Sequence, residues 1–386
     1  MRILHTSDWH LGRSFHGEGL LGAQAAFVDH LVATVESEQV DLVVLSGDVY
    51  DRALPPVDAV ALADEAFQRL ADSRARVVAT SGNHDSARRL GFSSRLIDRA
   101  GVHLRTDPSR VAEPVLLDDQ HGPVAVYGIP YLEPDVIRHL WELSARSHQA
   151  ALTRAMQMVR ADLATRAGAR SVVLAHAFVA GGEPSDSERD IAVGGVSMVP
   201  ASLFDGLDYT ALGHLHGRAT LTEGVRYSGS PLAYSFSEAG HVKGSWLVDL
   251  DARGVAGATF VEAPVPRPLA RLEGTIADLL ESRRHAGHEQ SWVQATLTDP
   301  VRPAQAMERL RSRFPHALAL RFAPTGGSET SARATTAGKQ PHEIGLDFVR
   351  HVRGEAASPM ESAMLRDAFD CCPEDPDLLA DRAVGS

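Results

Sequence analysis

The sequence is poor in cysteine and in long apolar runs. Its only two cysteines among 386 residues, Cys371 and Cys372, are adjacent, so they suit neither a long-range disulfide nor a cysteine zinc site. No apolar run reaches the roughly 18 residues that a membrane helix needs, and no charged-then-apolar leader opens the chain. We therefore expect a soluble cytoplasmic protein with no membrane partner. The chain also lacks a Gly-rich phosphate loop of the kind that binds ATP.

An excess of positive charge is missing as well. With 38 Lys and Arg against 50 Asp and Glu, the formal net charge is −12. This balance argues against DNA binding by a general basic surface, so any contact with a polyanion must come from local Arg patches or bound cations. The composition, 44% hydrophobic and 23% charged, is that of an ordinary globular protein with room for two domains.

Five runs rich in Val, Leu and Ala have the composition of buried strands, and each ends in metal-ligand residue types. Because open α/β sheets bind ligands where their strands stop, these ends are the first candidates for chemistry. The five ends carry Asp8 and His10, Asp48, Asn83 with His84 and Asp85, His176, and His214 with His216.

The order of the patterns predicts an α/β protein in several parts. Strand and helix alternate first, with helices expected near 27–35, 57–71 and 86–100, and this βαβ order implies parallel pairing. A β-rich layer and a helix over 133–167 follow. We expect domain 1–263, a small strand–helix–strand–helix–strand domain 264–323 after a Pro-rich connector, a flexible linker 324–342, and a helical tail 343–386. In the tail, Ser358 and Glu361 form a capping box with Pro359 at the first helical position.

The ligand types point to divalent cations. Asp, His and Asn without cysteine suit Mn²⁺ or Fe²⁺ and could accept Zn²⁺. Asp8 and His10 can converge on one ion, and a carboxylate such as Asp48 can bridge two. Two ions about 3.5–4 Å apart activate a water and clamp both oxygens of a phosphate displacement, which is phosphoester hydrolysis.

His84 has a different expected role, because its neighbour Asn83 is the better ligand candidate. An imidazole beside the metals can hydrogen-bond a phosphoryl oxygen and protonate the departing alkoxide. Asp85 could hold the other ring nitrogen of His84.

Each of these features also has a structural interpretation. A single His at a strand end is more often a hydrogen-bonded structural residue, and Gly-Asn or Gly-Asp is often turn chemistry. Five strand ends that all carry ligand types make coincidence a poor explanation. The arginines at 88, 89, 95 and 99 fit a solvated helix face or a phosphate track equally well. The apolar stripe of the tail fits an intramolecular core or, after a linker, a partner surface.

The ordered motifs resemble those of the calcineurin-like metallophosphoesterases and, within them, the SbcD-type nuclease subunits. The motifs are Ser7-Asp8-Trp9-His10-Leu11-Gly12-Arg13, Gly47-Asp48-Val49-Tyr50-Asp51-Arg52, Gly82-Asn83-His84-Asp85, Ala175-His176 and Gly213-His214-x-His216. The resemblance covers nearly the whole chain. It implies a four-layer αββα sandwich, a small α/β capping domain and a helical C-terminal tail that binds a partner.

The resemblance also implies a site. One ion would be held by Asp8, His10, Asp48 and His216, and the second by Asp48, Asn83, His176 and His214. His84 would be the catalytic histidine that binds no metal, and Asp85 would orient it. Mn²⁺ is the expected metal, with Mg²⁺, Fe²⁺ or Zn²⁺ as alternatives.

The activity implied by the resemblance is that of a 3′-to-5′ double-strand exonuclease and single-strand or hairpin endonuclease in DNA repair, recombination and replication. The chain would work in the nucleoid as a homodimer within a heterotetramer with an SbcC-like SMC-type ATPase. Contacts with DNA are expected at Arg88, Arg89 and Arg95, and contacts with the ATPase at Ile344, Phe348, Met364 and Leu365.

Two other hypotheses compete with the nuclease. The chain could be another metallophosphoesterase acting on a protein phosphate or a cyclic nucleotide, but a cyclic nucleotide enzyme would not need the last 120 or so residues. It could also be a non-catalytic subunit that bridges DNA ends, although a scaffold has no use for complete ligand sets.

Overall fold

The computed structural model describes residues 1–188, 198–325, 339–353 and 355–371. The chain divides into two compact units, Met1–Ala323 and Pro324–Ser386. Among the described helices, none is both long and apolar enough to cross a membrane. Residues 326–338 of the expected linker and 372–386 of the expected tail, including Cys372, lie outside the described residues.

The first six-stranded sheet has the order β14-β13-β1-β4-β5-β6. Its strands β1, β4, β5 and β6 run parallel, and β13 and β14 extend the sheet antiparallel beyond β1. Helices α1 and α2 bury their apolar faces on it, as the spacing of Phe27, Val28 and Leu31 predicts. The elements are β1 (Arg2–Thr6), α1 (Leu21–Ser37), β4 (Leu42–Ser46), α2 (Val57–Asp72), β5 (Arg76–Thr80), β6 (Val102–Arg105), β13 (Gly244–Asp251) and β14 (Gly254–Glu262).

The second six-stranded sheet has the order β11-β12-β10-β9-β8-β7. Strands β8, β9, β10 and β12 are parallel, and the two outer strands pair antiparallel. Its elements are β7 (Val115–Asp119), β8 (Gly122–Ile129), α5 (Pro134–Leu140), α6 (His148–Leu163), β9 (Arg170–His176), the 3₁₀ turn Ala201–Phe204, β10 (Tyr209–Gly213), β11 (Ala219–Thr222) and β12 (Val225–Tyr227).

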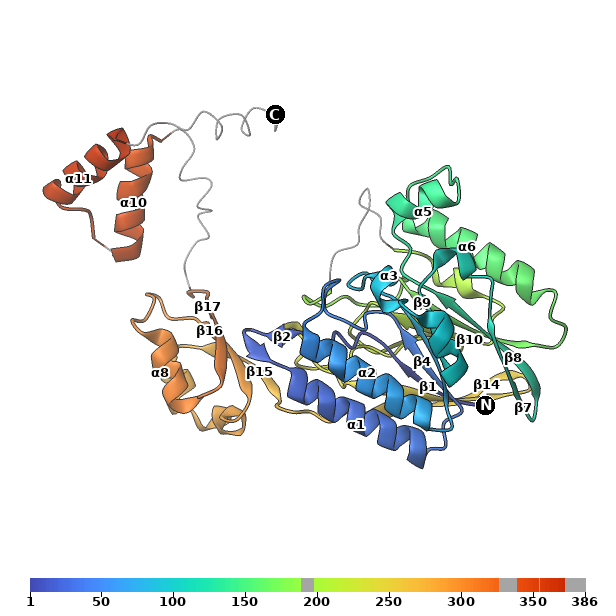
Figure 1. Ribbon diagram of the computed structural model, residues 1–386. Helices are drawn as coiled ribbons and strands as arrows, with labels where there is room; N and C mark the ends of the chain where they lie inside the picture. Colours follow the sequence, from blue (N-terminus) through green and yellow to red (C-terminus); the bar gives the residue numbers. More distant parts are fainter. Residues whose placement is uncertain (189–197, 326–338, 354, 372–386) are drawn as a thin grey trace. The chain divides into compact units, whose positions relative to one another are not determined.

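The two sheets pack face to face and bury an apolar layer between them. Val44 of β4, Val78 of β5 and Leu174 of β9 are fully buried in this layer. Figure 1 shows α1 and α2 on one outer face and α5 and α6 on the opposite one. The architecture is therefore the expected four-layer αββα sandwich.

Two expected helices are broken. Residues 86–100 form α3 (Ala87–Leu90), α4 (Ser94–Ile97) and the 3₁₀ turn Asp98–Ala100, because Ser93 has a left-handed backbone with φ of 61° that ends the helical path. The expected helix over 133–167 is also interrupted, between α5 and α6. Strands β6, β7 and β11, and the small hairpin of β2 (Ser14–Phe15) and β3 (Glu18–Gly19), were not expected.

A small parallel sheet, β15-β16-β17, follows within the first unit and has its own apolar core with α7 and α8. Trp292 of β16 contacts Phe15, with ring centroids 5.3 Å apart. The strand–helix order is the one expected for 264–323, whereas the domain division remains a prediction. The elements are β15 (Leu269–Gly274), α7 (Ile276–Glu281), the 3₁₀ turn Arg283–His288, β16 (Trp292–Leu297), α8 (Ala306–Arg313) and β17 (Ala317–Phe322).

In the second unit two amphipathic helices, α10 (Pro341–Arg353) and α11 (Pro359–Asp370), pack against each other. Gly345 permits this approach, because a Cβ there would lie 3.0 Å from the ring of Phe369. The predicted capping box is confirmed: Glu361 N donates to Ser358 Oγ over 3.3 Å, and Ser358 N donates to the Glu361 carboxylate over 2.7 Å.

Candidate metal centre

The five expected strand ends exist, and they are divided between the two sheets of the sandwich. Strands β1, β4 and β5 end at an edge of the first sheet, and β9 and β10 end at an edge of the second sheet. Their ligand residues meet because the sheets are stacked with these edges together. The loops after β1 and β4 are joined by backbone hydrogen bonds, His10 N to Asp48 O at 2.9 Å and Asp8 N to Gly47 O at 3.1 Å.

Four of the site residues have a backbone that residues other than glycine rarely adopt. Their φ angles are 54° at Asp8, 46° at His10, 49° at Asp48 and 104° at His214. Such conformations cost on the order of 1–3 kcal/mol each and persist where the surrounding structure fixes them, which is typical of functional sites. The strain falls on the residues that bring the side chains together.

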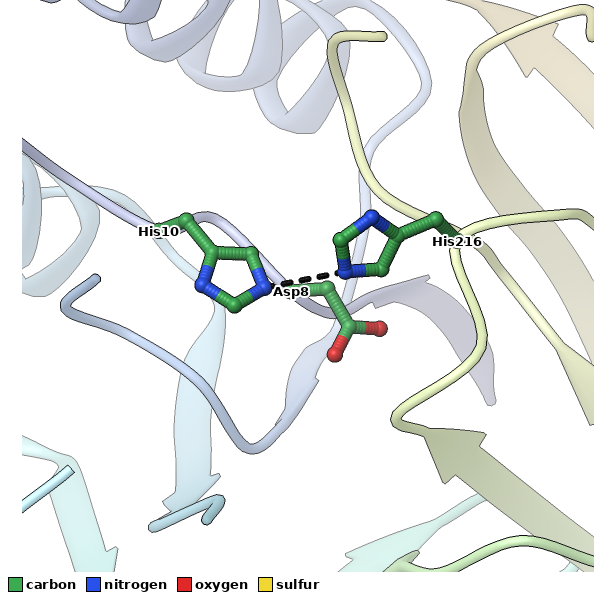
Figure 2. A group of neighbouring side chains, drawn as sticks. All are labelled: Asp8, His10 and His216. Carbon is green, nitrogen blue, oxygen red and sulfur yellow. Dashed lines mark hydrogen bonds between the residues drawn. The ribbon is translucent and has the colours of Figure 1, made fainter. Parts of the chain in front are cut away.

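Asp8, His10 and His216 form one group. One donor atom from each lies within 4.8 Å of the others, and all three side chains are buried. Figure 2 shows the two imidazoles facing each other beside the Asp8 carboxylate, with 3.0 Å between the Nε2 atoms. The Asp8 carboxylate also accepts hydrogen bonds from Ser7 Oγ at 2.5 Å and from the backbone N–H of His214 at 3.0 Å.

Asp8, Asp48 and His176 form a second group. Asp48 Oδ2 lies 3.4 Å from His176 Nε2 and 3.6 Å from His10 Nε2, so this carboxylate stands between the two groups. Asn83 joins the second group through its Oδ1, 2.9 Å from His176 Nε2.

His214 lies beside the second group, without a ring nitrogen among the mutually close donor atoms. Its ring meets that of His176 edge to face, with centroids 5.3 Å apart. The structure therefore brings all seven expected ligands to one place, and the division into two ion sites remains a proposal.

The chemistry of these groups fits divalent cations. Burial raises the pKa of Asp8 to about 6, and the Asp48 carboxylate overcomes the effect of burial to raise the pKa of His176 to about 9. Burial lowers the pKa of His10 well below its usual range, and its Nδ1 has no hydrogen-bond partner among the described residues. A divalent cation satisfies carboxylates and neutral imidazoles together, which protons cannot do.

His84 lies against the first group. Its ring meets that of His10 edge to face, with centroids 4.6 Å apart, and one of its ring nitrogens lies within 4.8 Å of one donor atom each of His10 and Asp48. Its backbone N–H donates to Asp48 Oδ1 over 2.8 Å, and its Nδ1 lies 2.7 Å from the carbonyl oxygen of Asp51. A carbonyl can only accept, so Nδ1 carries a proton and Nε2 is the nitrogen that can exchange one with a substrate.

The expectation that Asp85 orients His84 is wrong in its contacts, because the Asp51 carbonyl holds Nδ1. Asp85 instead accepts hydrogen bonds from three backbone N–H groups, those of Val49 at 3.1 Å, Tyr50 at 2.9 Å and Gly82 at 2.9 Å. It joins the loop after β4 to the loop after β5. Burial, followed by the charge of Asp48, raises the pKa of Asp85 to about 7.

Two glycines permit the close approach of these loops. A Cβ on Gly82 would lie 2.1 Å from Asp48 Oδ1, and a Cβ on Gly213 would lie 1.8 Å from the carbonyl oxygen of Ser46. The loop after β5 and the end of β10 can therefore reach Asp48 and β4 only without side chains at these positions.

Sequence reasoning missed the residues behind His216. Ser187 Oγ lies 2.6 Å from His216 Nδ1, and Glu188 accepts the backbone N–H of His216 over 2.7 Å. Glu238, which is fully buried, accepts hydrogen bonds from Ser187 Oγ and from the buried ammonium group of Lys243. These Ser, Glu and Lys residues belong to no motif, so no spacing in the sequence could have signalled this network.

The arginines expected to contact DNA lie on α3 and α4, and all three are exposed. Arg88 and Arg95 line a cavity that begins at Asn83, whereas Arg89 does not. In the second unit, Phe348 and Met364 are each 66% exposed, and Ile344 and Leu365 are half-buried. These contacts with DNA and with a partner remain predictions.

Comparison with protein families gives two matches. The family described as calcineurin-like phosphoesterase matches residues 1–218. The SbcD_C family, described as the type 5 capsule protein repressor C-terminal domain, matches residues 265–352.

Solved structures similar to this chain include three proteins of low sequence identity. TT1561 of Thermus thermophilus is 16% identical, with 67% of this chain and 98% of that chain covered and a TM-score of 0.38. A dimetal phosphatase from Danio rerio is 14% identical, with 68% and 99% covered and a TM-score of 0.39. A structure titled as a novel archaeal phosphodiesterase is 11% identical, with 68% and 100% covered and a TM-score of 0.30.

Proposed function

Because this chain belongs to the calcineurin-like phosphoesterase family, we propose that it is a two-metal phosphodiesterase whose substrate is DNA, a nuclease of the SbcD type. The observation that carries the proposal is the order of its parts. A phosphoesterase domain with seven converging ligand candidates is followed by a segment that matches the SbcD C-terminal domain. A phosphoesterase for small esters has no evident use for that segment.

In this proposal Asp8, His10, Asp48 and His216 hold one ion, and Asp48, Asn83, His176 and His214 hold the other. The position of Asp48 between the two groups supports its role as the shared ligand. The mixed oxygen and nitrogen donors suit Mn²⁺ best, with Mg²⁺, Fe²⁺ or Zn²⁺ as alternatives. When bound, the pair of ions supplies an activated water and charge neutralisation at the phosphate.

The chain itself supplies the proton for the leaving group. His84 is held at Nδ1 by the Asp51 carbonyl, so its imidazolium form can give the Nε2 proton to the departing alkoxide. Asp85 acts indirectly, because it fixes the loop that carries His84 against the loop that carries Asp51.

The finer activity follows the SbcD type: 3′-to-5′ exonuclease action on duplex ends and endonuclease action on single strands and hairpins. We assign the ATPase contact to α10 and α11, where Phe348 and Met364 are exposed. A homodimer contact is assigned to α2 and α4, where Val57 is 83% exposed and Leu96 69% exposed. Exposed apolar side chains of this size are typical of interaction surfaces.

Digestion of end-labelled duplex DNA in Mn²⁺ tests the proposal. The purified chain, a His84→Ala variant and a control variant at an exposed histidine, His121→Ala, are compared on DNA, on bis-p-nitrophenyl phosphate and on a phosphomonoester. We expect shortening of the duplex that is lost in His84→Ala and retained in His121→Ala. Hydrolysis of small esters with the DNA intact, also after addition of an SbcC-type ATPase, would contradict the nuclease and retain only the phosphoesterase.

A further inference from the structure

A cavity of about 760 Å³ opens from the proposed metal centre between α3–α4 and α5. Its lining includes Ser81, Gly82 and Asn83, and Asn83 is the residue that reaches His176. The volume lies in the range of pockets that take small organic ligands. A substrate phosphate at the metal centre would therefore have one neighbouring group at the mouth of this cavity.

The wall formed by α3 and α4 is cationic. Arg88 and Arg95 are exposed, and no hydrogen bond or ion pair joins either guanidinium to another described side chain. Arg105 also lines the cavity and is only 8% exposed; its Nη1 donates to Asp98, but its Nε has no hydrogen-bond partner among the described residues. Unpaired guanidinium groups beside a cavity favour an anionic ligand, phosphate above all.

The lining also holds three acidic residues, Asp85, Asp107 and Glu133, and Glu133 accepts a hydrogen bond from the Tyr131 hydroxyl over 3.4 Å. Asp85 has both carboxylate oxygens occupied by backbone N–H groups, and Asp107 accepts the backbone N–H of Ser109 over 2.9 Å. Arg110, a fourth arginine of the lining, is paired with Glu113 over 2.7 Å. Among the described residues, neither Arg88 nor Arg95 forms an ion pair with any of these carboxylates, so both guanidinium groups remain available to a ligand.

A second part of the lining is apolar and aromatic. It is formed by Tyr131 and by Val136, Ile137 and Leu140 of α5, of which Val136 is 61% exposed. The ring of Tyr131 meets that of His176 edge to face, with centroids 6.3 Å apart, so this wall also begins beside the metal centre. A cavity lined by arginines in one part and by apolar and aromatic side chains in another fits a molecule that carries both a phosphate and a flat base with its sugar.

We propose that this cavity binds one nucleotide of the DNA strand, the nucleotide next to the phosphate that is cleaved. Its phosphate lies against Arg88 and Arg95, and its sugar and base lie along the wall of Tyr131 and α5. The assignment rests on the proposed nuclease function and deepens it, because it names the residues that hold the nucleotide beside the cleaved phosphate.

Nucleotide binding by the metal-free protein in EDTA tests the cavity separately from catalysis. Calorimetric titration with 5′-deoxyadenosine monophosphate, deoxyadenosine and inorganic phosphate should show the monophosphate binding more tightly than either fragment. Arg88→Ala and Arg95→Ala should each weaken that binding about tenfold, as expected for a charge-assisted hydrogen bond. Arg99→Ala, an exposed arginine outside the cavity, should not change it.

A second variant pair tests the apolar wall. Val136→Trp should fill part of the cavity and weaken monophosphate binding, and Leu116→Trp, a similarly exposed apolar residue on β7, should not. Inorganic phosphate that binds as tightly as the nucleotide, or nucleotide binding that is insensitive to both arginines, would overturn the assignment.

Hydrolysis of bis-p-nitrophenyl phosphate by the Mn²⁺-loaded protein distinguishes a failure of the cavity proposal from a failure of the proposed function. Hydrolysis without arginine-dependent nucleotide binding would remove the cavity proposal and leave a phosphodiesterase. Arginine-dependent nucleotide binding without hydrolysis of this ester or of DNA would support the cavity and contradict the proposed function.

Discussion

Ser187 Oγ lies 2.6 Å from Nδ1 of His216, on the side of the ring opposite the Nε2 atom that faces His10. The hydroxyl also donates to the buried carboxylate of Glu238, so it must accept from Nδ1–H of the imidazole. That proton leaves Nε2 with its lone pair toward the site. A chain of hydrogen bonds from Glu238 through Ser187 thus selects the tautomer of a proposed metal ligand.

Ser187→Ala should weaken metal binding without unfolding the protein. Loss of a partner behind a metal-binding histidine typically costs about 10–100-fold in affinity, so we expect a weakening of about tenfold or more. Mn²⁺ titration followed by calorimetry measures the affinity, and urea unfolding in EDTA measures the stability of the metal-free protein.

Ser202→Ala, at an exposed serine of the 3₁₀ turn before β10, is the matched control and should change neither quantity. Equal Mn²⁺ affinity in Ser187→Ala and Ser202→Ala would show that the hydroxyl does not position His216.

Gly82→Ala should remove the metal centre by displacing Asp48. The added Cβ would lie 2.1 Å from Asp48 Oδ1 and 2.4 Å from Asp48 N, so the loop after β5 and the Asp48 side chain cannot both keep their places. We expect loss of at least one bound Mn²⁺ per chain, measured by metal analysis after gel filtration.

The control for this variant is Gly22→Ala in α1, where an added Cβ meets nothing within 4 Å. Alanine in a helix should stabilise the protein by roughly 0.5–1 kcal/mol. Full metal content in Gly82→Ala would mean that the loop moves without cost and that the glycine is not required.

The sequence predicts the parts of this site that depend on local pattern. The runs before Asp8, Asp48 and His176 are strands because apolar β-branched residues are continuous there, and the ligands follow where each run stops. Strand β9 comes close to β4 because the two sheets stack. This stacking depends on contacts between residues far apart in the chain, so the local sequence pattern does not predict it.

The failed expectations have the same physical origin. The role given to Asp85 was inferred from its place next to His84, but the partners of its carboxylate, Val49 and Tyr50, come from another loop. The buried ion pair of Glu238 and Lys243 was missed for the same reason. These two residues matter because of their contacts with His216 in the folded protein, and nothing in the local sequence signals those contacts.

Replacement of His84 should affect poor leaving groups more than good ones. If His84 protonates the departing alkoxide, His84→Gln should reduce kcat on DNA by roughly 10²–10⁴-fold, the usual contribution of a general acid. Loss on bis-p-nitrophenyl phosphate should be much smaller, because p-nitrophenolate leaves without a proton. Metal content should be retained in the variant.

Rates on both substrates at saturating concentration, together with metal analysis, check this prediction. An equal loss on DNA and on the nitrophenyl ester, or a loss of metal, would assign His84 to phosphate binding or to metal ligation instead. The second outcome is a real alternative, because the donor atoms of His84, His10 and Asp48 are mutually close.

Asp119 and Arg170 should make the stability of the sandwich sensitive to acid. Arg170 Nη2 lies 2.5 Å from the Asp119 carboxylate, and its guanidinium also donates to the carbonyl oxygens of Gly122 at 2.8 Å and Asp251 at 3.2 Å. It therefore joins the β7–β8 hairpin of one sheet to the end of β13 in the other. Although burial alone would raise it, the Arg170 guanidinium and the N-terminal ammonium group of Met1, which lies 2.7 Å from the carboxylate, hold the pKa of Asp119 well below its usual range.

A carboxylate whose pKa is lower in the folded than in the unfolded state stabilises the fold at every pH above its unfolded pKa, which is about 4. That contribution is lost as the pH falls from the unfolded pKa toward the folded pKa.

Asp119→Asn leaves the buried Arg170 short of a charged acceptor and should cost roughly 1–3 kcal/mol of unfolding free energy at pH 7. The difference from the unmodified protein should stay constant from pH 7 to 5. It should shrink progressively below about pH 4, because the unfolded chain of the unmodified protein then takes up a proton at Asp119 while the folded state still keeps the charge. Urea unfolding in EDTA at each pH measures the difference, with Asp118→Asn, at an exposed position of the same strand, as the control. A difference that persists undiminished at about pH 3.5 would mean that Asp119 acts through its shape and hydrogen bonds, and that its charge contributes nothing to the joint between the sheets.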